Sequence, residues 1–151
     1  MTATISRPKI SNWETSNIPN LTGKTALITG ANSGLGYYTA KALAEKNAHV
    51  VIACRSLEKA NQTIKKLKGL NPEGLFTPLE LDLSDLKNIV EVQSKIFDNF
   101  ENLDLLINNA GIMHPPKTLS AQGYEIQFAV NHLAHMLLTL KLLPIIEKKE
   151  E

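Results

Sequence analysis

Short apolar runs alternate with longer amphipathic segments along most of this chain. Four short runs are predicted to be strands: 24–29, 49–53, 76–81 and 103–108. The second, 49–53, is continuous and apolar, which suits a parallel strand buried on both faces. Apolar residues recur at helical spacing in the segments that follow these runs: 33–46, 56–68, 84 to about 97 or 100, and 121–143. The pattern therefore predicts four strands, each followed by a helix.

Residues at the segment ends and on the helix faces refine this prediction. Ser56 and Ser84 are placed to cap the second and third helices, and Asn47 suits a left-handed end to the first. Pro144 is expected to end the last helix. The apolar faces are expected to include Leu35, Thr39 and Leu43 on the first helix and Leu86, Ile89, Val90 and Ile96 on the third.

Strands that alternate with helices predict parallel βαβ units with right-handed crossovers. We therefore expect an α/β fold: a doubly wound, Rossmann-like parallel sheet of about four strands in the order 3-2-1-4, with helices on both faces. The chain divides into an N-terminal arm (1–20), one Rossmann domain (21–146) and a short tail (147–151). A length of 151 residues suits a single domain with a real core.

Composition narrows the class of protein further. A net charge of +1 gives no electrostatic argument for a nucleic-acid partner. The single cysteine, Cys54, excludes an internal disulfide and fits a reducing compartment. Residues 1–10 have no apolar core of a secretory signal. Polar residues and Pro144 interrupt the leucine-rich stretch 128–146, so we expect a buried amphipathic helix, no membrane span and a cytoplasmic protein.

A glycine-rich turn, T-G-A-N-S-G-L-G at 29–36, joins the first strand to the first helix. Unpaired N–H groups and the dipole at a helix start favour an anion, so the turn predicts a phosphate site. Gly30 permits the sharp turn, Gly34 lets backbone approach a pyrophosphate, and Gly36 lets the helix pack closely. Asn32, Ser33 and Leu35 complete the predicted contact surface. The spacing matches neither G-x-G-x-x-G nor a P-loop, and a tight turn without a ligand is the alternative.

Two further strand ends carry candidate cofactor residues. Arg55 follows the second strand, where an acid would bind the ribose 2′-OH of NAD and an arginine accommodates the 2′-phosphate of NADP. No acid occurs between Val50 and Leu57, so NADP(H) is the predicted cofactor, with an ordinary exposed surface arginine as the alternative. Asp82 and Leu83 follow the third strand, at the edge where ligands bind, although Asp82 could equally cap a turn.

Asparagines mark the fourth strand end and the last helix. Asn108-Asn109-Ala110-Gly111 ends the fourth strand, and its small residues leave room for a flat ligand. Asn131 lies in the interior of the last helix, where asparagine has poor propensity; a satisfied buried amide is the common reason for such a residue.

Together these motifs resemble the short-chain dehydrogenase/reductase family, in particular its retinol dehydrogenase-like branch, over residues 19–146. The matching motifs are I-P-x-L-x-G-K, T-G-A-N-S-G-L-G, A-C-R, L-D-L-S, N-N-A-G-I-M, G-Y-E and V-N-H-L-x-H, with mild departures at Ala134 and Met136. The resemblance implies an NADP(H)-dependent oxidoreductase of lipophilic aldehydes or alcohols. It also implies that Asp82 and Leu83 contact adenine, that Asn109, Ala110 and Gly111 border the cofactor, and that Asn131 holds a water in the proton relay.

The family's chemistry further requires a serine and a Tyr-x-x-x-Lys pair beyond the helix asparagine. Only twenty residues follow Asn131, and none is a tyrosine. Tyr37-x-x-x-Lys41 has the right spacing but lies on the helix at the phosphate turn. We therefore expect the cofactor-binding part of a truncated oxidoreductase, with negligible turnover alone. A non-catalytic NADP-binding or interaction module, or an inactive fragment, is the alternative.

Two expectations about partners complete the interpretation. Family members often pair through helices of this region, so we expect a homo-oligomer. His132 and His135 are spaced to share a metal, but no third ligand is evident, and we expect interior polar contacts and no metal site.

Overall fold

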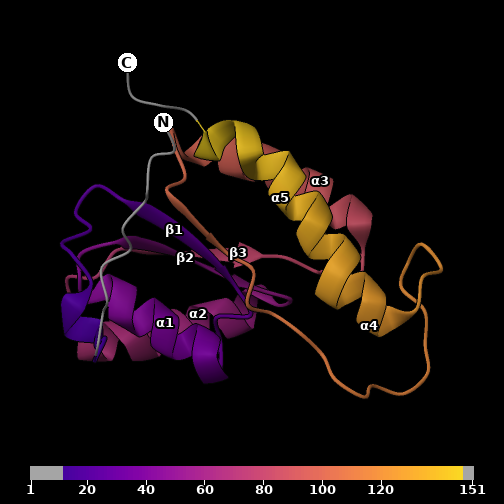
Figure 1. Cartoon of the computed structure of the whole chain (residues 1–151), viewed down its shortest axis with the longest axis horizontal. Helices are drawn as coiled ribbons and strands as arrows, with labels where there is room; N and C mark the ends of the chain where they lie inside the picture. Colours follow the sequence, from indigo (N-terminus) through magenta and orange to yellow (C-terminus); the bar gives the residue numbers. More distant parts are fainter. Residues whose placement is uncertain (1–11, 148–151) are drawn as a thin grey trace, which may run out of the picture.

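The computed structural model describes residues 12–147, and their elements alternate as the pattern predicts (Figure 1). The elements are η1 (Thr15–Asn17), β1 (Thr25–Thr29), α1 (Gly34–Ala44), β2 (His49–Cys54), α2 (Leu57–Leu70), β3 (Phe76–Glu80), α3 (Leu86–Asn99), β4 (Leu105–Ile107), α4 (Ile126–Phe128), η2 (Ala129–Leu133) and α5 (Ala134–Ile146). Part of the predicted arm, residues 1–11, and most of the predicted tail, 148–151, lie outside the described residues.

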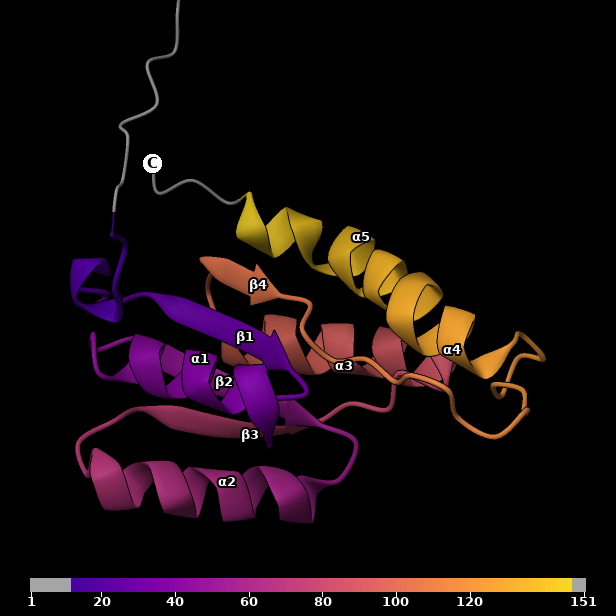
Figure 2. The same cartoon turned by 60° about the horizontal axis from the view of Figure 1, so that its bottom comes forward.

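All four strands are parallel, in the order β3-β2-β1-β4, which confirms the predicted fold class. In the register, Ile28 of β1 lies between Ile52 of β2 and Ile107 of β4. Helices cover both faces: α1 and α2 lie on one side of the sheet, and α3 and α5 lie on the other (Figures 1 and 2). The carboxyl ends of all four strands therefore meet at one edge.

Alternate residues along the strands build two separate cores, one on each face. Ala26 and Ile28 of β1 pack with Ala40 of α1 and Ala60 of α2. Leu27, between them in sequence, instead joins the core that contains α3 and α5. The central strands β1 and β2 are buried almost throughout because helices cover both of their faces, whereas the edge strands β3 and β4 are only partly buried.

The first helix differs from the prediction in its buried face. Its core residues are Gly36, Ala40, Leu43 and Ala44, whereas Leu35 is 80% exposed. Leu35 lies in the first turn, beyond the end of the strand that the helix covers, so no core is available to it. The left-handed helix end at Asn47 is confirmed by its φ of 68°.

The third helix begins one residue later than predicted. Asp85, not Ser84, is its N-cap, and the Asp85 carboxylate accepts a hydrogen bond from the Lys87 N–H. The Ser84 hydroxyl instead donates to Asp82. Ile89 and Ile96 are buried as expected, but Val92 takes the place given to Val90, which is exposed.

The last helix runs from 126 to 146, so it begins about five residues later than the predicted start near 121 and ends near Pro144 as expected, two residues beyond it. It begins at Ile126 because the Glu125 carboxylate accepts from the N–H groups of Gln127 and Phe128. It continues through Pro144, which has no N–H to bond the carbonyl one turn earlier. Ile145 beyond the proline is buried, and this burial favours the additional turn. A π-helical turn, η2, interrupts it at Ala129–Leu133.

Within residues 12–147, this helix alone is long and apolar enough to cross a membrane by length and composition. In the structure its buried residues include Ala134, Leu138 and Leu142, which belong to the core that α3 and the sheet share. The core helix of a soluble protein passes the same length and composition criteria. The absence of a membrane span therefore stays a prediction.

Candidate functional site

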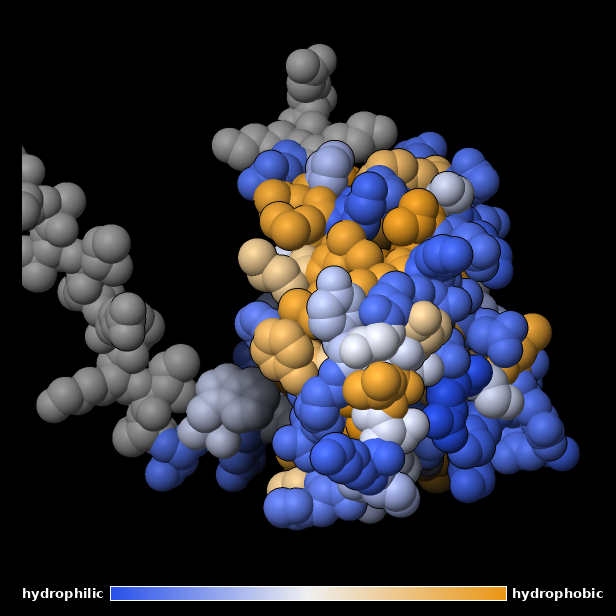
Figure 3. All heavy atoms as spheres, turned by 90° about the vertical axis from the view of Figure 1, so that its right-hand side faces the viewer, coloured by the Kyte–Doolittle hydropathy of each residue, from blue (hydrophilic) through white to orange (hydrophobic). Residues whose placement is uncertain are grey.

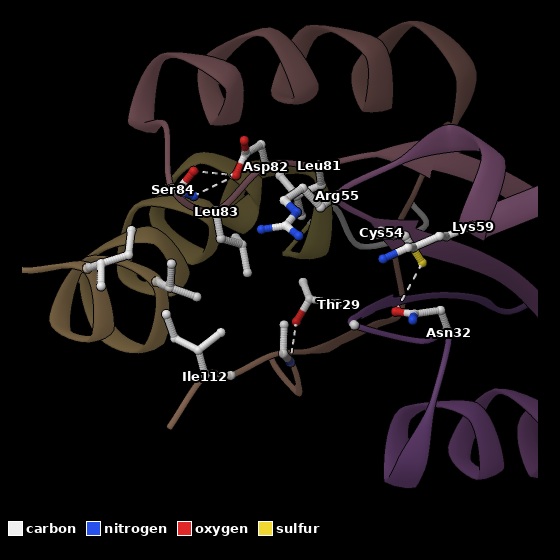
Figure 4. A pocket seen from close by; sticks show the side chains of 16 residues that line it. Thr29, Asn32, Cys54, Arg55, Lys59, Leu81, Asp82, Leu83, Ser84 and Ile112 are labelled. Carbon is white, nitrogen blue, oxygen red and sulfur yellow. Dashed lines mark hydrogen bonds between the residues drawn. The ribbon is translucent and has the colours of Figure 1, made fainter. Parts of the chain in front are cut away.

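A cavity of about 270 Å³ lies where the carboxyl ends of the strands meet the start of the last helix (Figure 4). Residues that follow each of the four strands line it. The lining comprises Thr29, Gly30, Asn32, Ala53, Cys54, Arg55, Lys59, Leu81, Asp82, Leu83, Ser84, Ala110, Gly111, Ile112, Ile126 and Val130. The position is the one at which open α/β sheets bind ligands.

The structure brings most of the predicted cofactor residues together in this cavity. Those that line it are Gly30, Asn32, Arg55, Asp82, Leu83, Ala110 and Gly111. Ser33, Gly34 and Leu35 are exposed at the start of α1, outside the lining. Gly36, Asn109 and Asn131 also lie outside the lining, and the first two support it from behind.

Gly30 and Gly36 have the geometry predicted for them, and the approach of a pyrophosphate at Gly34 stays a prediction. Gly30 has a φ of +65°, and a Cβ there would lie 2.9 Å from the Ala110 Cα. A Cβ at Gly36 would lie 2.5 Å from both the Gly30 carbonyl oxygen and the Asn109 Nδ2. At Gly34, whose φ is +54°, a Cβ would meet no atom of the described residues within 4 Å. Backbone thus faces open space at the start of α1, which suits an approaching phosphate.

Two cations converge on the side of the cavity that β2 and α2 form. Arg55 follows β2, and Lys59 lies in the first turn of α2, which Ser56 caps as predicted by accepting from the Lys59 N–H at 3.5 Å. In Figure 4 the Arg55 guanidinium extends into the space between Leu83 and Thr29, and Lys59 lies beside Cys54. Among residues 12–147, neither cation forms a salt bridge within 4.0 Å. Both charges are therefore available to an anion in the cavity.

Sequence reasoning missed both Lys59 and the contact between Cys54 and Asn32. Lys59 comes four residues after Arg55, across the first turn of a helix, and that spacing could have identified it. The Cys54 thiol donates a hydrogen bond to the Asn32 Oδ1 at 3.7 Å. Burial raises the pKa of this thiol, against smaller opposing effects of the Asn32 contact and the Lys59 charge. The thiol and the Asn32 side chain thus contact each other at the cavity wall.

Asp82 caps a turn, which was one of its two interpretations. Its Oδ1 accepts from the Ser84 N–H at 2.9 Å and from the Ser84 hydroxyl at 2.6 Å, and its own N–H donates to the Asn88 Oδ1 at 2.8 Å. These contacts hold Asp82 and Leu83 at the lining. Contact with adenine stays a prediction.

Asn109 joins the ends of β1 and β4. Its Nδ2 donates to the carbonyl oxygens of Thr29 and Gly30 at 2.9 and 3.3 Å. The small Ala110 and Gly111 that follow keep this end of the cavity open, since Ala110 packs against Gly30 and Gly111 lies beside the Asn131 side chain.

Asn131 lies in the π-helical turn, and its side chain is exposed, so the interpretation as a buried amide is wrong, although both ends of the carboxamide are hydrogen-bonded. The Oδ1 accepts from the Ile112 N–H at 2.9 Å, and the Nδ2 donates to the Ile112 carbonyl at 2.8 Å. The side chain therefore ties the helix to the segment that follows β4. A role in a proton relay stays a prediction.

The two histidines of the last helix do not converge. His135 is buried and lies 2.9 Å from the Thr29 hydroxyl, whereas His132 is exposed and stacks on Phe128. No group of three or more His, Cys, Asp or Glu side chains in the described part of the chain could hold a metal ion. Tyr37 and Lys41 lie on α1 away from the cavity lining, and Lys41 pairs with Glu45.

Comparison with known proteins decides the family. Residues 24–151 match the family described as short chain dehydrogenase. This chain belongs to the short-chain dehydrogenase family. It is 44% identical over 121 residues to retinol dehydrogenase 13 of Homo sapiens, covering 80% of this chain and 37% of that protein. It is 41% identical over 138 residues to the short chain dehydrogenase/reductase dpchH of Colletotrichum higginsianum, covering 89% and 34%.

Solved short-chain dehydrogenases have the same architecture. The structure of a metagenomic short-chain oxidoreductase in complex with NADP aligns with a TM-score of 0.73 and 27% identity, over 84% of this chain and 58% of that one. The chain spans 34–44% of the length of the curated relatives. The comparisons thus support a nicotinamide-dependent oxidoreductase family and the cofactor-binding type of fold.

Proposed function

We propose that this chain is the NADP(H)-binding part of a retinol dehydrogenase-like short-chain oxidoreductase. The observation that carries the choice of cofactor is the pair of cations, Arg55 and Lys59, which line the cavity and form no salt bridge within residues 12–147. A 2′-phosphate is the group that distinguishes NADP from NAD, and a guanidinium binds phosphate bidentately.

The glycine turn at 29–36 suits the remaining parts of the dinucleotide, beginning with its pyrophosphate. Close packing at Gly30 and Gly36 brings β1, α1 and the segment after β4 together, and the open backbone at Gly34 would hold the pyrophosphate. Leu83 and Asp82 would border the adenine, and Ala110 and Gly111 would leave room for the other half of the cofactor. The bound cofactor would supply hydride transfer to or from a carbonyl or alcohol carbon.

An apolar surface near the cavity supports a lipophilic aldehyde or alcohol as substrate. Met113, Leu119 and Phe128 are all exposed, and they belong to the segment after β4 and the start of the last helix. Figure 3 views this end of the molecule and shows apolar atoms gathered among polar ones. Apolar surface beside a cofactor site suits an apolar substrate.

The alternative is an NADP-binding module without catalysis. It is favoured by the cavity lining, which contains no tyrosine in the described part of the chain. A general acid is needed for carbonyl reduction, and a phenol with its pKa lowered from about 10 toward 7 requires roughly 4 kcal/mol of stabilisation. We therefore expect this chain alone to turn over negligibly.

Calorimetric titration with NADP⁺ and with NAD⁺ tests the proposal. We expect NADP⁺ to bind at least about tenfold more tightly, because a charge-assisted hydrogen bond contributes roughly 1.5–3 kcal/mol. Absence of NADP⁺ binding would contradict the proposed function. An NADPH-dependent assay on a panel of aldehydes separates the two forms of the proposal, since turnover by this chain alone would exclude the non-catalytic module.

A further inference from the structure

The Thr29 hydroxyl makes three hydrogen bonds at the end of β1, although the residue is fully buried. Its Oγ1 accepts from the Asn109 N–H at 3.0 Å and from the Ala110 N–H at 2.9 Å, and it lies 2.9 Å from the Nε2 of His135. A hydroxyl has two acceptor lone pairs and one proton. Because both lone pairs are taken, Thr29 donates its proton to His135.

The donors and acceptors around Thr29 determine which nitrogen of the His135 ring carries the proton. The Nε2 accepts from Thr29 and so carries no proton. The Nδ1 lies 3.3 Å from the Asn131 carbonyl oxygen, which can only accept, so the proton is on Nδ1. His135 is 7% exposed, and burial also disfavours the charged imidazolium. The hydrogen bonds thus select a neutral ring in the Nδ1–H tautomer.

His135 closes a circuit of hydrogen bonds around one wall of the cavity. Thr29 holds Ala110, the Asn131 carboxamide holds Ile112, and His135 joins Asn131 to Thr29. Thr29, Ala110 and Ile112 line the cavity, whereas His135 lies behind them. The imidazole therefore connects β1 and the last helix across 106 positions of the chain without touching the space for a ligand.

We propose that His135, as a neutral Nδ1–H imidazole, is a positioning residue of the cofactor site. It orients the Thr29 hydroxyl toward itself, which leaves both lone pairs to hold the Asn109 and Ala110 N–H groups. It also anchors the Asn131 carbonyl. The inference rests on the proposed function, because the wall so held is one wall of the proposed NADP(H) cavity.

The tautomer is tested without any cofactor, by long-range ¹⁵N–¹H NMR of the histidine ring nitrogens at pH 7.5. We expect the His135 Nδ1 to have the chemical shift of a protonated nitrogen and the Nε2 that of an acceptor. An Nε2–H tautomer or an imidazolium would overturn the proposal, since either would require Thr29 to point its proton elsewhere.

The positioning role is tested by NADP⁺ calorimetry on three variants, with melting temperatures measured in parallel. His135→Gln places an amide oxygen near the former Nε2 and should bind within about threefold of wild type. His135→Leu keeps an apolar side chain but no acceptor and should bind about tenfold more weakly or worse. The control is His132→Gln, three residues away and exposed, which should bind as wild type does. Equal losses in the Gln and Leu variants would indicate packing alone and overturn the proposal.

A double-mutant cycle shows whether His135 acts through Thr29. Thr29→Val removes the hydroxyl, and adding His135→Leu to it should weaken NADP⁺ binding by little more than Thr29→Val alone. Additive losses of NADP⁺ affinity in the double variant would overturn the proposal. If His135→Leu does not fold, the Thr29→Val variant alone provides the test. Unchanged NADP⁺ binding by that variant would then overturn the proposal. Failure of the wild type to bind NADP⁺ would instead overturn the proposed function. The NMR measurement of the His135 tautomer needs no cofactor, so it tests the hydrogen bonds of His135 separately from the proposed function.

Discussion

Gly36 packs directly against the carbonyl oxygen of Gly30, so that a Cβ at Gly36 would lie 2.5 Å from it. The neighbouring atom is backbone and cannot rotate away, so Gly36→Ala must push α1 from the end of β1. Overpacking of this kind costs about 1–3 kcal/mol. We expect a lower urea midpoint and weaker NADP⁺ binding, because the displaced turn forms part of the proposed phosphate site.

Gly69 offers a matched control for this substitution. It lies in α2, and a Cβ there would meet no atom of the described residues within 4 Å. Because alanine has the higher helix propensity, Gly69→Ala should raise stability by roughly 0.5–1 kcal/mol. If Gly36→Ala were as stable as Gly69→Ala in urea unfolding, the close approach of α1 to β1 would be contradicted.

Strand positions could be predicted because this fold requires a simple pattern. A parallel strand covered by helices on both faces must be buried throughout and therefore mostly apolar; β1 is buried along its whole length, and β2 is buried after His49. Helix faces were harder to assign. Leu35 has the spacing of a core residue, but the first turn of α1, in which it lies, extends beyond the end of the sheet. The spacing of residues along one helix does not show where the sheet ends. Ser84 and Asp85 are both good caps, and the tertiary structure decides between them: Ser84 bonds Asp82, and Asp85 accepts from the Lys87 N–H.

Sequence reasoning could predict those residues of the candidate site whose position follows from one strand end alone. The glycines and Arg55 lie directly after strands, so the fold alone brings them to one edge. The contact between Thr29 and His135 joins residues 106 positions apart and has no local signal. The cytoplasmic location, the homo-oligomer and the proton-relay role of Asn131 stay predictions.

Charge reversal at Arg55 tests its predicted contact with the 2′-phosphate. Arg55→Asp should weaken NADP⁺ binding by about ten- to a hundredfold, since it removes a charge-assisted hydrogen bond of roughly 1.5–3 kcal/mol and adds repulsion. NAD⁺ should bind equally well or better, because an acid there can accept from the ribose 2′-OH. Calorimetry with both cofactors gives the ratio, and an unchanged NADP⁺/NAD⁺ ratio would contradict the assignment.

Lys59 is expected to contribute less than Arg55, because an ammonium contacts phosphate as a point charge and not bidentately. Lys59→Gln should weaken NADP⁺ binding by about fivefold to tenfold and leave NAD⁺ binding nearly unchanged. Lys66→Gln, on the exposed side of the same helix, is the control for net charge. Equal effects of the two substitutions would indicate a long-range charge effect and exclude a specific role for Lys59.

Two histidines, the half-buried His49 and the buried His135, predict how stability depends on pH. Burial lowers the pKa of both His49 and His135 from the ordinary value of 6.5. The unfolded chain therefore takes up protons first as the pH falls, so the stability these residues contribute is complete above about pH 6.5 and is lost below it. Urea midpoints should fall between pH 7.5 and 5.5, and the fall should be smaller in His135→Gln than in His132→Gln. Equal falls in the two variants would show that His135 does not titrate differently on folding.

Leu138 and Leu140 lie two residues apart on α5 and distinguish a core helix from a membrane helix. Leu138 is 0% exposed among the residues packed with α3, whereas Leu140 is 55% exposed. Leu138→Ala should therefore lower the free energy of unfolding by about 2–5 kcal/mol. Leu140→Ala should change it by less than about 0.5 kcal/mol, as exposed substitutions do. Urea unfolding of the two variants in aqueous buffer measures the difference. Equal effects of the two substitutions on the free energy of unfolding would contradict the packing of α5 against α3 and the sheet. The apolar residues of α5 would then have to be buried against something else.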